Sequence, residues 1–179
     1  GKNILVNEYK TLDQYSLIFG RVFSDIHIGV WITDPIYYFR NNKYLYYKKF
    51  DFEALINETV YNDQTNPSIA FLKQQNFVIA WENRIGERIF AKVQRFYDDS
   101  IKLFEFEVGE EDNILSKLFP KILSYKESEF IISYYIVGNR NNQYVKSIKL
   151  VRYSYEGKKI IYKNLIDTGV ISSYNIYDL

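Results

Sequence analysis

Residues 77–108 read FVIAWENRIGERIFAKVQRFYDDSIKLFEFEV, which are three apolar stretches joined by short polar turns. Apolar and polar residues alternate along much of this segment, as they do in strands with one buried face. A two-residue turn at Asp98-Asp99 places Val93 opposite Phe104 and Lys92 opposite Glu105. Because one register satisfies both packing and charge, the segment predicts an antiparallel β-meander.

The same periodicity extends on both sides of the meander. In DIHIGVWI, residues 25–32, Ile28 and Val30 share one face while His27 and Trp31 share the other. The C-terminal part predicts three or four further strands, joined by turns at Gly138 to Asn142, Glu156-Gly157 and Thr168-Gly169. These are FIISYYIV (130–137), QYVKSIKLVRYSY (143–155), KKIIYKNLI (158–166) and GVISSYNIY (169–177).

An aromatic hairpin is predicted between these regions. Residues 37–50, YYFRNNKYLYYKKF, contain seven aromatic rings around Asn41-Asn42. A two-residue turn at this pair puts Phe39 opposite Tyr44 and Tyr37 opposite Tyr46. Four rings then share one face of the hairpin.

Four segments have the spacing of amphipathic helices. The first is TLDQYSLIFGRVF, residues 11–23, with a capping box at Thr11 and Gln14. The second is DFEALINE, residues 51–58, and the third begins at Asn66 with Pro67 in the first helical position. The fourth follows Asp112, repeats apolar residues through Ile122 and is kinked near Pro120.

Strands in hairpins, helices between them and no alternating βαβ pattern predict an α+β fold. We expect about 8–10 mainly antiparallel strands with 3–4 helices packed on them. The 179 residues suffice for a real core, so we expect one domain over 1–179, weakly subdivided near 109–127. No internal repeat is visible in the sequence.

Several classes of site are excluded by composition. The absence of Cys removes disulfides, thiol catalysis and thiolate metal sites. His27 is the single histidine, so one chain cannot build a multi-histidine metal site. Motifs typical of nucleotide, calcium and serine-hydrolase sites do not occur. We therefore expect no cofactor and no metal.

No apolar run approaches the roughly 20 residues that span a bilayer. The sequence starts at Gly1 and contains no Met. Removal of a signal peptide or membrane anchor accounts for this, and so does excision from a longer protein. Of these two alternatives the first is our expectation, namely an exported or membrane-tethered protein.

The excess of aromatic residues indicates a binding surface. The chain has 18 Tyr and 13 Phe, although a bias toward A/T-rich codons explains part of this number. Tyr and Trp give large contact area at low entropic cost and dominate binding hot spots. The residues that we expect to bind a ligand are Trp31, Tyr37, Tyr38, Phe39, Tyr44, Tyr46 and Trp81.

Opposite charges are concentrated in two regions. Residues 98–112 hold seven acidic residues and one basic one, a net charge of −6. Residues 140–164 hold seven basic residues and one acidic one, a net charge of +6, with tyrosines between them. Such a basic surface with aromatic residues can bind a phosphate backbone and stack bases, or can face the acidic region within the fold. The candidate polyanion-binding residues are Lys149, Arg152, Lys158, Lys159 and Lys163.

Carboxylates are the remaining route to catalysis. Glu105 and Glu107 alternate on one strand and so point to one face, as paired acids of a hydrolase do. His27 could serve a Ser-His-Asp triad, although a single histidine on a strand is commonly a packing residue. Because no catalytic signature accompanies them, the sequence favours a non-enzymatic domain that binds a protein, a peptide or a small ligand. Nucleic-acid or polyanion binding and a carboxylate-dependent hydrolase are the alternatives.

Overall fold

The computed structural model of the chain describes residues 13–22, 26–34, 44–49, 52–56, 62–73, 76–97, 101–109, 116–126, 128–140 and 143–167, with residue 127 and the other gaps outside the description. All twelve elements in this part are β-strands, and it contains no helix. The antiparallel sheet is therefore confirmed, but the α+β class with 3–4 helices is wrong. The strands are β1 (Asp13–Val22), β2 (Ile26–Asp34), β3 (Tyr44–Lys49), β4 (Phe52–Leu55), β5 (Asp63–Phe71), β6 (Phe77–Ile85), β7 (Arg88–Tyr97), β8 (Ile101–Glu107), β9 (Ser116–Tyr125), β10 (Glu129–Arg140), β11 (Gln143–Tyr153) and β12 (Lys159–Asp167).

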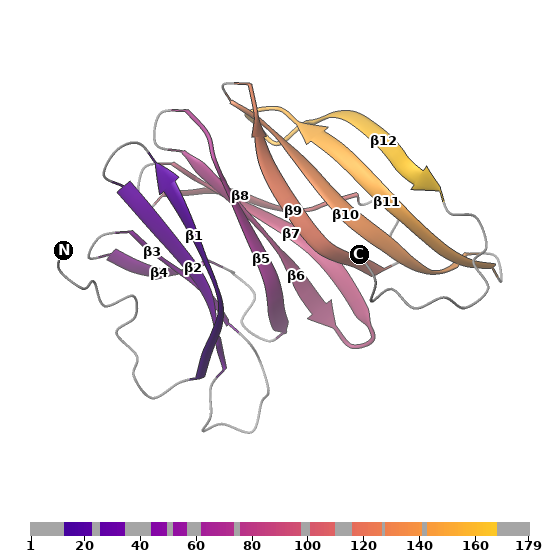
Figure 1. Cartoon of the computed structure of the whole chain (residues 1–179), viewed down its shortest axis with the longest axis horizontal. Helices are drawn as coiled ribbons and strands as arrows, with labels where there is room; N and C mark the ends of the chain where they lie inside the picture. Colours follow the sequence, from indigo (N-terminus) through magenta and orange to yellow (C-terminus); the bar gives the residue numbers. More distant parts are fainter. Residues whose placement is uncertain are drawn as a thin grey trace.

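The strands form three sheets of four, and each sheet is an up-and-down meander in chain order. Sheet A contains β1 to β4, sheet B contains β5 to β8, and sheet C contains β9 to β12. Every strand pair is antiparallel. The three sheets follow one another across the molecule in the order of the sequence (Figure 1).

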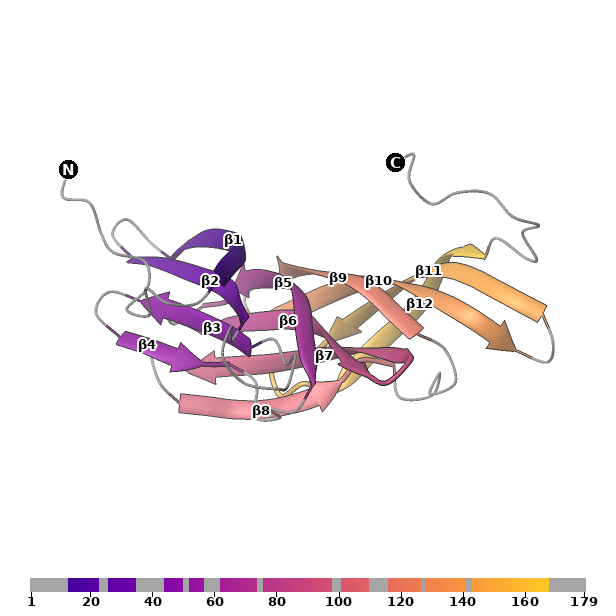
Figure 2. The ribbon, with the colours of Figure 1, turned by 90° about the horizontal axis from the view of Figure 1, so that it is seen from below.

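Two apolar cores lie between successive sheets. One joins Val30, Ile32 and Ile56 of the sheet A region to Phe77 and Trp81 of sheet B. The other joins sheet B to sheet C and includes Val78, Ala80, Phe130, Ile132 and Tyr134. Sheet B is consequently buried on both faces, and Figure 2 shows it between the other two sheets. We call the face toward the preceding sheet the leading face and the face toward the following sheet the trailing face.

A β-bulge occurs at the same place in the first strand of each sheet. The register shifts between Tyr15 and Ile18 in β1, between Thr65 and Ser68 in β5, and across residues 119 and 120 in β9. In each bulge two residues oppose one residue of the next strand. Those single residues are Trp31, Trp81 and Tyr134, at intervals of 50 and 53 positions (81 − 31 and 134 − 81).

The bulges reveal a structural repeat that the sequence does not show. Each repeat of about 50 residues builds one four-stranded meander, and the first strands are neighbours, β1 of β5 and β5 of β9. β-Propellers are built from four-stranded sheets repeated in this way. The three sheets therefore resemble consecutive propeller blades.

The helix predictions for residues 11–23 and from Asp112 are wrong because of these bulges. The described part of 11–23 is β1, and β9 takes the place of the helix expected after Asp112. An extra residue in a strand shifts its alternation by one position. Residues of one face on the two sides of a bulge are then three apart instead of two, and an interval of three is also found on a helix.

The other two predicted helices are also strands. Pro67 lies in the β5 bulge, directly after Asn66 with a φ of 50°. A proline is tolerated there because a bulge residue is not required to donate to the ladder. The predicted helix DFEALINE contains β4, which pairs with β3 in an antiparallel register that begins with Lys49 opposite Phe52.

The strand pairing that we predicted for the aromatic hairpin of residues 37–50 is wrong. Tyr46 pairs with Trp31 of β2 and with Leu55 of β4, so both sides of β3 are occupied by other strands. Tyr44 pairs with Thr33. Tyr37, Tyr38 and Phe39 lie outside the described residues.

The meander of residues 77–108 is confirmed, with a register that differs by two. Val93 pairs with Phe106 and Lys92 with Glu107, because the turn is longer than two residues and β8 contains a bulge. A shift of two keeps the residues from Phe104 to Glu107 on their predicted face. Lys92 still forms the expected ion pair with Glu105, at 3.4 Å and now across a diagonal.

Candidate functional site: the trailing face of sheet C

Sheet C is covered on one face only. Along β10, Phe130, Ile132, Tyr134 and Ile136 are buried against sheet B. The residues between them, from Ile131 to Val137, are half-buried and lie on the opposite, trailing face. From Phe130 to Val137 this strand is apolar at every position except Ser133, a pattern typical of strands covered on both faces.

The apolar character continues across neighbouring strands. Ile131 is paired with Leu123 of β9 and Arg152 of β11, and Arg152 is paired with Ile161 of β12. Tyr135 is paired with Ile148, and its ring meets that of Phe119 edge-on at 6.2 Å. The trailing face of sheet C comprises the apolar residues Phe119, Leu123, Tyr125, Ile131, Tyr135, Val137, Ile148, Leu150 and Ile161 and the polar residues Lys121, Glu129, Ser133, Lys146 and Arg152.

Two side chains show how accessible this face is. Leu123 is 68% exposed and Phe119 is 46% exposed. Burying a leucine side chain contributes roughly 1.5–3 kcal/mol, so leaving one in water forgoes most of that stabilisation. An exposed face of this kind is typical of an interaction surface.

One ion pair lies at the corner of the face. The Arg152 guanidinium donates to a Glu129 carboxylate oxygen at 2.5 Å and stacks over the ring of Tyr125 at 4.6 Å. The hydrogen bond from Arg152 lowers the pKa of Glu129, and the same bond raises the pKa of Arg152. The charge at this corner is therefore balanced within the sheet.

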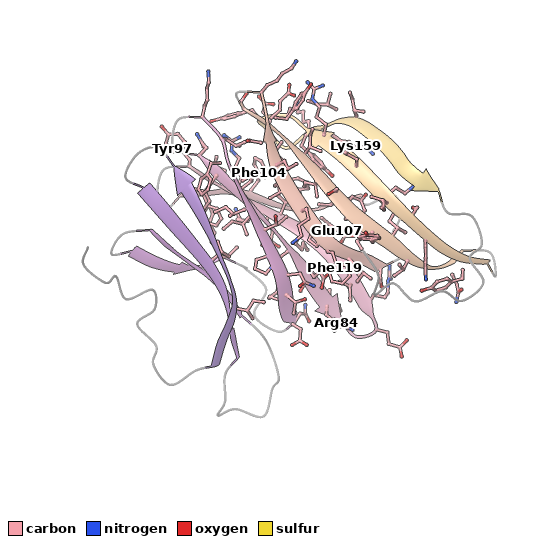
Figure 3. All side chains as sticks on the ribbon, viewed as in Figure 1. Arg84, Tyr97, Phe104, Glu107, Phe119 and Lys159 are labelled. Carbon is pink, nitrogen blue, oxygen red and sulfur yellow. The ribbon has the colours of Figure 1, made fainter. Side chains whose placement is uncertain are left out.

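A pocket opens beside the same face. It has a volume of about 420 Å³ and lies where the bulges of β5 and β9 approach each other. Figure 3 labels Arg84 and Phe119, two of its lining residues. The full lining is Ile32, Thr65, Asn66, Glu82, Arg84, Ile89, Leu118 and Phe119.

Glu82 connects the two bulges beneath this pocket. Its side chain is buried, and one carboxylate oxygen accepts from the Thr65 hydroxyl at 2.8 Å. The other oxygen accepts from the backbone N–H of Phe119 at 2.6 Å. Phe119 has a φ of 51°, a backbone region that is unusual for a bulky residue and that marks functional or strained positions. The carboxylate thus holds Phe119 at the mouth of the pocket.

The predicted aromatic ligand-binding residues are divided by the fold. Trp81 is 1% exposed and lies in the core between sheets A and B. Trp31, Tyr44 and Tyr46 occupy paired positions on β2 and β3, and nothing is described of their side chains. The structure therefore brings Trp31 and Tyr46 together as backbone partners but places Trp81 in a different sheet.

The predicted polyanion-binding residues do not share one face. Arg152 belongs to the trailing face, whereas Lys149 pairs with Tyr134 and so belongs to the leading one. Lys158 and Lys159 are exposed at the turn into β12. Lys163 pairs with Leu150, and its side chain is not described.

The two candidate catalytic carboxylates each contact a lysine. Glu105 pairs with Lys92, and Glu107 accepts from Lys117 at 2.7 Å. Lys117 is fully buried, so this second pair ties the end of β8 to β9. His27 pairs with Arg21 in the backbone register, and its side chain is not described.

A buried arginine that sequence reasoning missed fixes the β11–β12 turn. Arg95 of β7 donates to the backbone carbonyl of Tyr155 and, at 3.1 Å, to Asn76 Oδ1. Its guanidinium also lies over the Tyr155 ring at 3.3 Å. Desolvation lowers the pKa of Arg95 in this position. The arginine has a structural part in joining sheets B and C.

No protein family model, curated protein or solved structure matches this chain.

In the described part of the chain, no group of three or more acidic or histidine side chains is placed to hold a metal ion. The same residues include no helix with the length and hydropathy to cross a membrane.

Proposed function

We propose that this chain is a non-enzymatic interaction domain that binds another protein through the trailing face of sheet C. The observation that carries the proposal is the contrast between equivalent sheets. Sheet B has an apolar trailing face that is covered by sheet C, and sheet C has an apolar trailing face with exposed Leu123 and Phe119.

The way in which repeat proteins bury their apolar surfaces supports a partner for this face. In stacked repeat proteins each unit buries its apolar surface on its neighbours, and terminal units need a polar outer face to stay soluble. The trailing face of sheet C is not polar throughout, because Leu123, Ile131 and Tyr135 lie among its polar residues. A partner that covers these positions would give them the burial that sheet B already has.

The test is binding of the apolar dye 8-anilinonaphthalene-1-sulfonate to dilute protein. We expect the wild-type chain to bind the dye and Leu123→Lys to lose most of the fluorescence, because a charge then interrupts the apolar surface. The matched control is Ile85→Lys, since Ile85 is 48% exposed at the end of β6 and outside the face. Equal dye binding by wild type and Leu123→Lys would refute the proposal.

A second candidate function is small-ligand binding in the pocket beside Phe119. The observation that favours it is Arg84, which is exposed at the pocket and forms no ion pair with another described residue. Apolar side chains of Ile89, Leu118 and Phe119 surround it. This combination suits a small carboxylate with an apolar body.

Phenylpropionate is a suitable probe for this second function. Chemical shift changes on titration should map to the pocket, and Arg84→Gln should weaken binding at least about tenfold by removing a charge-assisted hydrogen bond. Arg88→Gln is the control, because Arg88 lies over the ring of Phe90 and does not line the pocket. Unchanged affinity of Arg84→Gln would exclude this mode of binding.

A further inference from the structure

We infer that the pocket beside Phe119 binds a free α-amino acid with an apolar side chain. The Glu82 carboxylate accepts from the ammonium group of this ligand, and the Arg84 guanidinium binds its carboxylate. This inference rests on the second candidate function, because it names the ligand class of the same pocket. Its basis is the distribution of charge around Glu82.

Glu82 is a buried carboxylate whose two hydrogen-bond donors are both uncharged. It is 4% exposed, and it accepts from the Thr65 hydroxyl and from the Phe119 backbone N–H. It forms no ion pair with another described residue. A carboxylate offers about four lone-pair sites, so about two acceptor positions remain beside these two bonds. Such a group is suited to a further donor that carries a positive charge.

The other buried charges among the described residues are better balanced. Lys117 pairs with Glu107 at 2.7 Å. Arg95 lies over the Tyr155 ring and donates to two oxygen acceptors. Buried ionised side chains are ordinarily paired, because burial of a charge without a partner costs free energy. Since Glu82 lines the pocket, a cationic group of a ligand can supply the opposite charge.

Arg84 lies on the same face of β6 as Glu82. The two residues are two positions apart in a strand whose pairing with β7 is regular, so their Cα atoms are about 6.6 Å apart. Both residues line the pocket. An α-amino acid carries its ammonium and its carboxylate on one carbon atom, and each group can form a charge-assisted hydrogen bond of about 2.8 Å. Because the arginine side chain is long, the two residues can hold the two charged groups of one zwitterion.

The charge around the pocket favours a zwitterion over a plain carboxylate. Asp63 of β5 is the register partner of Arg84 and lies on the same face. The turn into β7 adds Glu87 and Arg88, whose charges cancel. With Asp63 and Glu82 against Arg84, this end of sheet B has a net charge of 1 − 2 = −1. A ligand that is only anionic meets this negative charge, whereas an ammonium group adds a favourable interaction.

The rest of the pocket is suited to an apolar side chain. Ile32, Ile89, Leu118 and Phe119 line it, and its volume of about 420 Å³ is typical of sites for small molecules. Phe119 is 46% exposed, so a ligand that covers its ring also buries apolar surface. Aromatic rings pack favourably on one another. Phenylalanine therefore combines the two charges with a ring that the pocket can bury.

Titration of the whole chain with L-phenylalanine and with 3-phenylpropionate tests the inference. The two compounds share the ring and the carboxylate, and only L-phenylalanine carries the ammonium group. We expect L-phenylalanine to bind at least about tenfold more tightly at pH 7, because it gains a charge-assisted hydrogen bond. Chemical shift changes at the pocket residues measure both affinities. Equal or weaker binding of L-phenylalanine would overturn the inference.

N-acetyl-L-phenylalanine tests the ammonium group without a change in the protein. Acetylation removes the positive charge and keeps the ring and the carboxylate. We expect this compound to bind at least about tenfold more weakly than L-phenylalanine. The same affinity for both compounds would show that the charge is not recognised, and it would also overturn the inference.

The variant Glu82→Gln assigns the recognition to one carboxylate. Glutamine keeps an oxygen acceptor for the Phe119 N–H but carries no charge. We expect the preference for L-phenylalanine over 3-phenylpropionate to disappear in this variant, and its persistence would contradict the role of Glu82. Glu105→Gln is the matched control that should keep the preference, because Glu105 pairs with Lys92 and does not line the pocket. The comparisons between ligands decide the question if Glu82→Gln does not fold.

The inference and the proposed pocket fail in distinguishable ways. Binding of 3-phenylpropionate that depends on Arg84 but is as tight as that of L-phenylalanine would refute the amino-acid ligand and leave the pocket in place. Binding of neither compound, or binding that Arg84→Gln leaves unchanged, would refute the pocket itself.

Discussion

Sheets B and C are built by the same repeat but differ in what surrounds them. Every residue from Phe77 to Asn83 is buried, because β6 has a neighbouring sheet on both sides. Along β10 buried and half-buried residues alternate, although its sequence is just as apolar. A strand that is apolar on both faces is therefore suited to burial on both faces. The contacts within one chain do not always bury both of them.

Removing a large side chain from the doubly covered sheet should give the largest effect. We expect Trp81→Ala to lower the free energy of unfolding by about 3–5 kcal/mol, because it leaves a cavity in a closed core. Leu123→Ala, on the trailing face of sheet C, should cost less than about 1 kcal/mol in dilute protein. Urea unfolding followed by circular dichroism measures both. Similar losses would mean that the two sheets are covered alike.

Glu82 tests the connection between the two sheets. Glu82→Ala should cost about 2–3 kcal/mol, because it leaves the Phe119 N–H without its acceptor. Thr65→Val removes only one hydrogen bond to the same carboxylate and should cost about 1 kcal/mol. Equal costs for the two variants would show that the bond to Phe119 contributes nothing.

The two lysine–glutamate ion pairs allow a contact within sheet B to be compared with a contact between sheets B and C. Glu107→Gln should cost about 1–2 kcal/mol, because the buried Lys117 loses its counter-ion while the partly exposed carboxylate limits the effect. Glu105→Gln should cost less than about 0.5 kcal/mol, because both partners of that pair are partly exposed. Chemical unfolding at pH 7 compares them. A larger cost for Glu105→Gln would contradict the inter-sheet assignment.

The smallest expected effect is a pH dependence on the trailing face of sheet C. The pKa of Glu129 is lowered from its ordinary value of 4.5 in the folded chain by Arg152. Its contribution to stability is therefore present above pH 4.5 and is lost as the pH falls through the lower, folded pKa. The stability difference between wild type and Glu129→Gln should shrink between pH 6 and pH 2.5. A stability difference between the two proteins that grows on acidification would contradict the predicted direction of the pH dependence.

Much of the strand content could be predicted from the sequence, since the two-residue period is strong in residues 77–108 and 130–166. The turn at Glu156-Gly157 is also confirmed, and Gly157 has the positive φ of 78° that favours glycine. Hydrophobic periodicity alone could not distinguish the four predicted helices from strands. Across the β9 bulge the buried residues Lys117 and Pro120 are three apart instead of two, and that interval also fits a helix.

The candidate site was only partly predictable. The strand FIISYYIV has apolar residues on both faces, and this signal could have indicated a sheet that needs two covers. The number of aromatic residues instead led to the prediction that Trp81 binds a ligand, whereas Trp81 is buried in the core. The pocket could not be predicted, because Thr65, Glu82 and Phe119 meet only through two bulges that are distant in sequence.

The bulges also decide which way the residues of each first strand point. The extra residue in β5 shifts its alternation by one position, so the residues before and after the Asn66-Pro67 pair follow different alternations. Deleting one residue of this pair would restore a single alternation and turn Thr65 to the other face of the sheet, away from the Glu82 carboxylate that it now contacts.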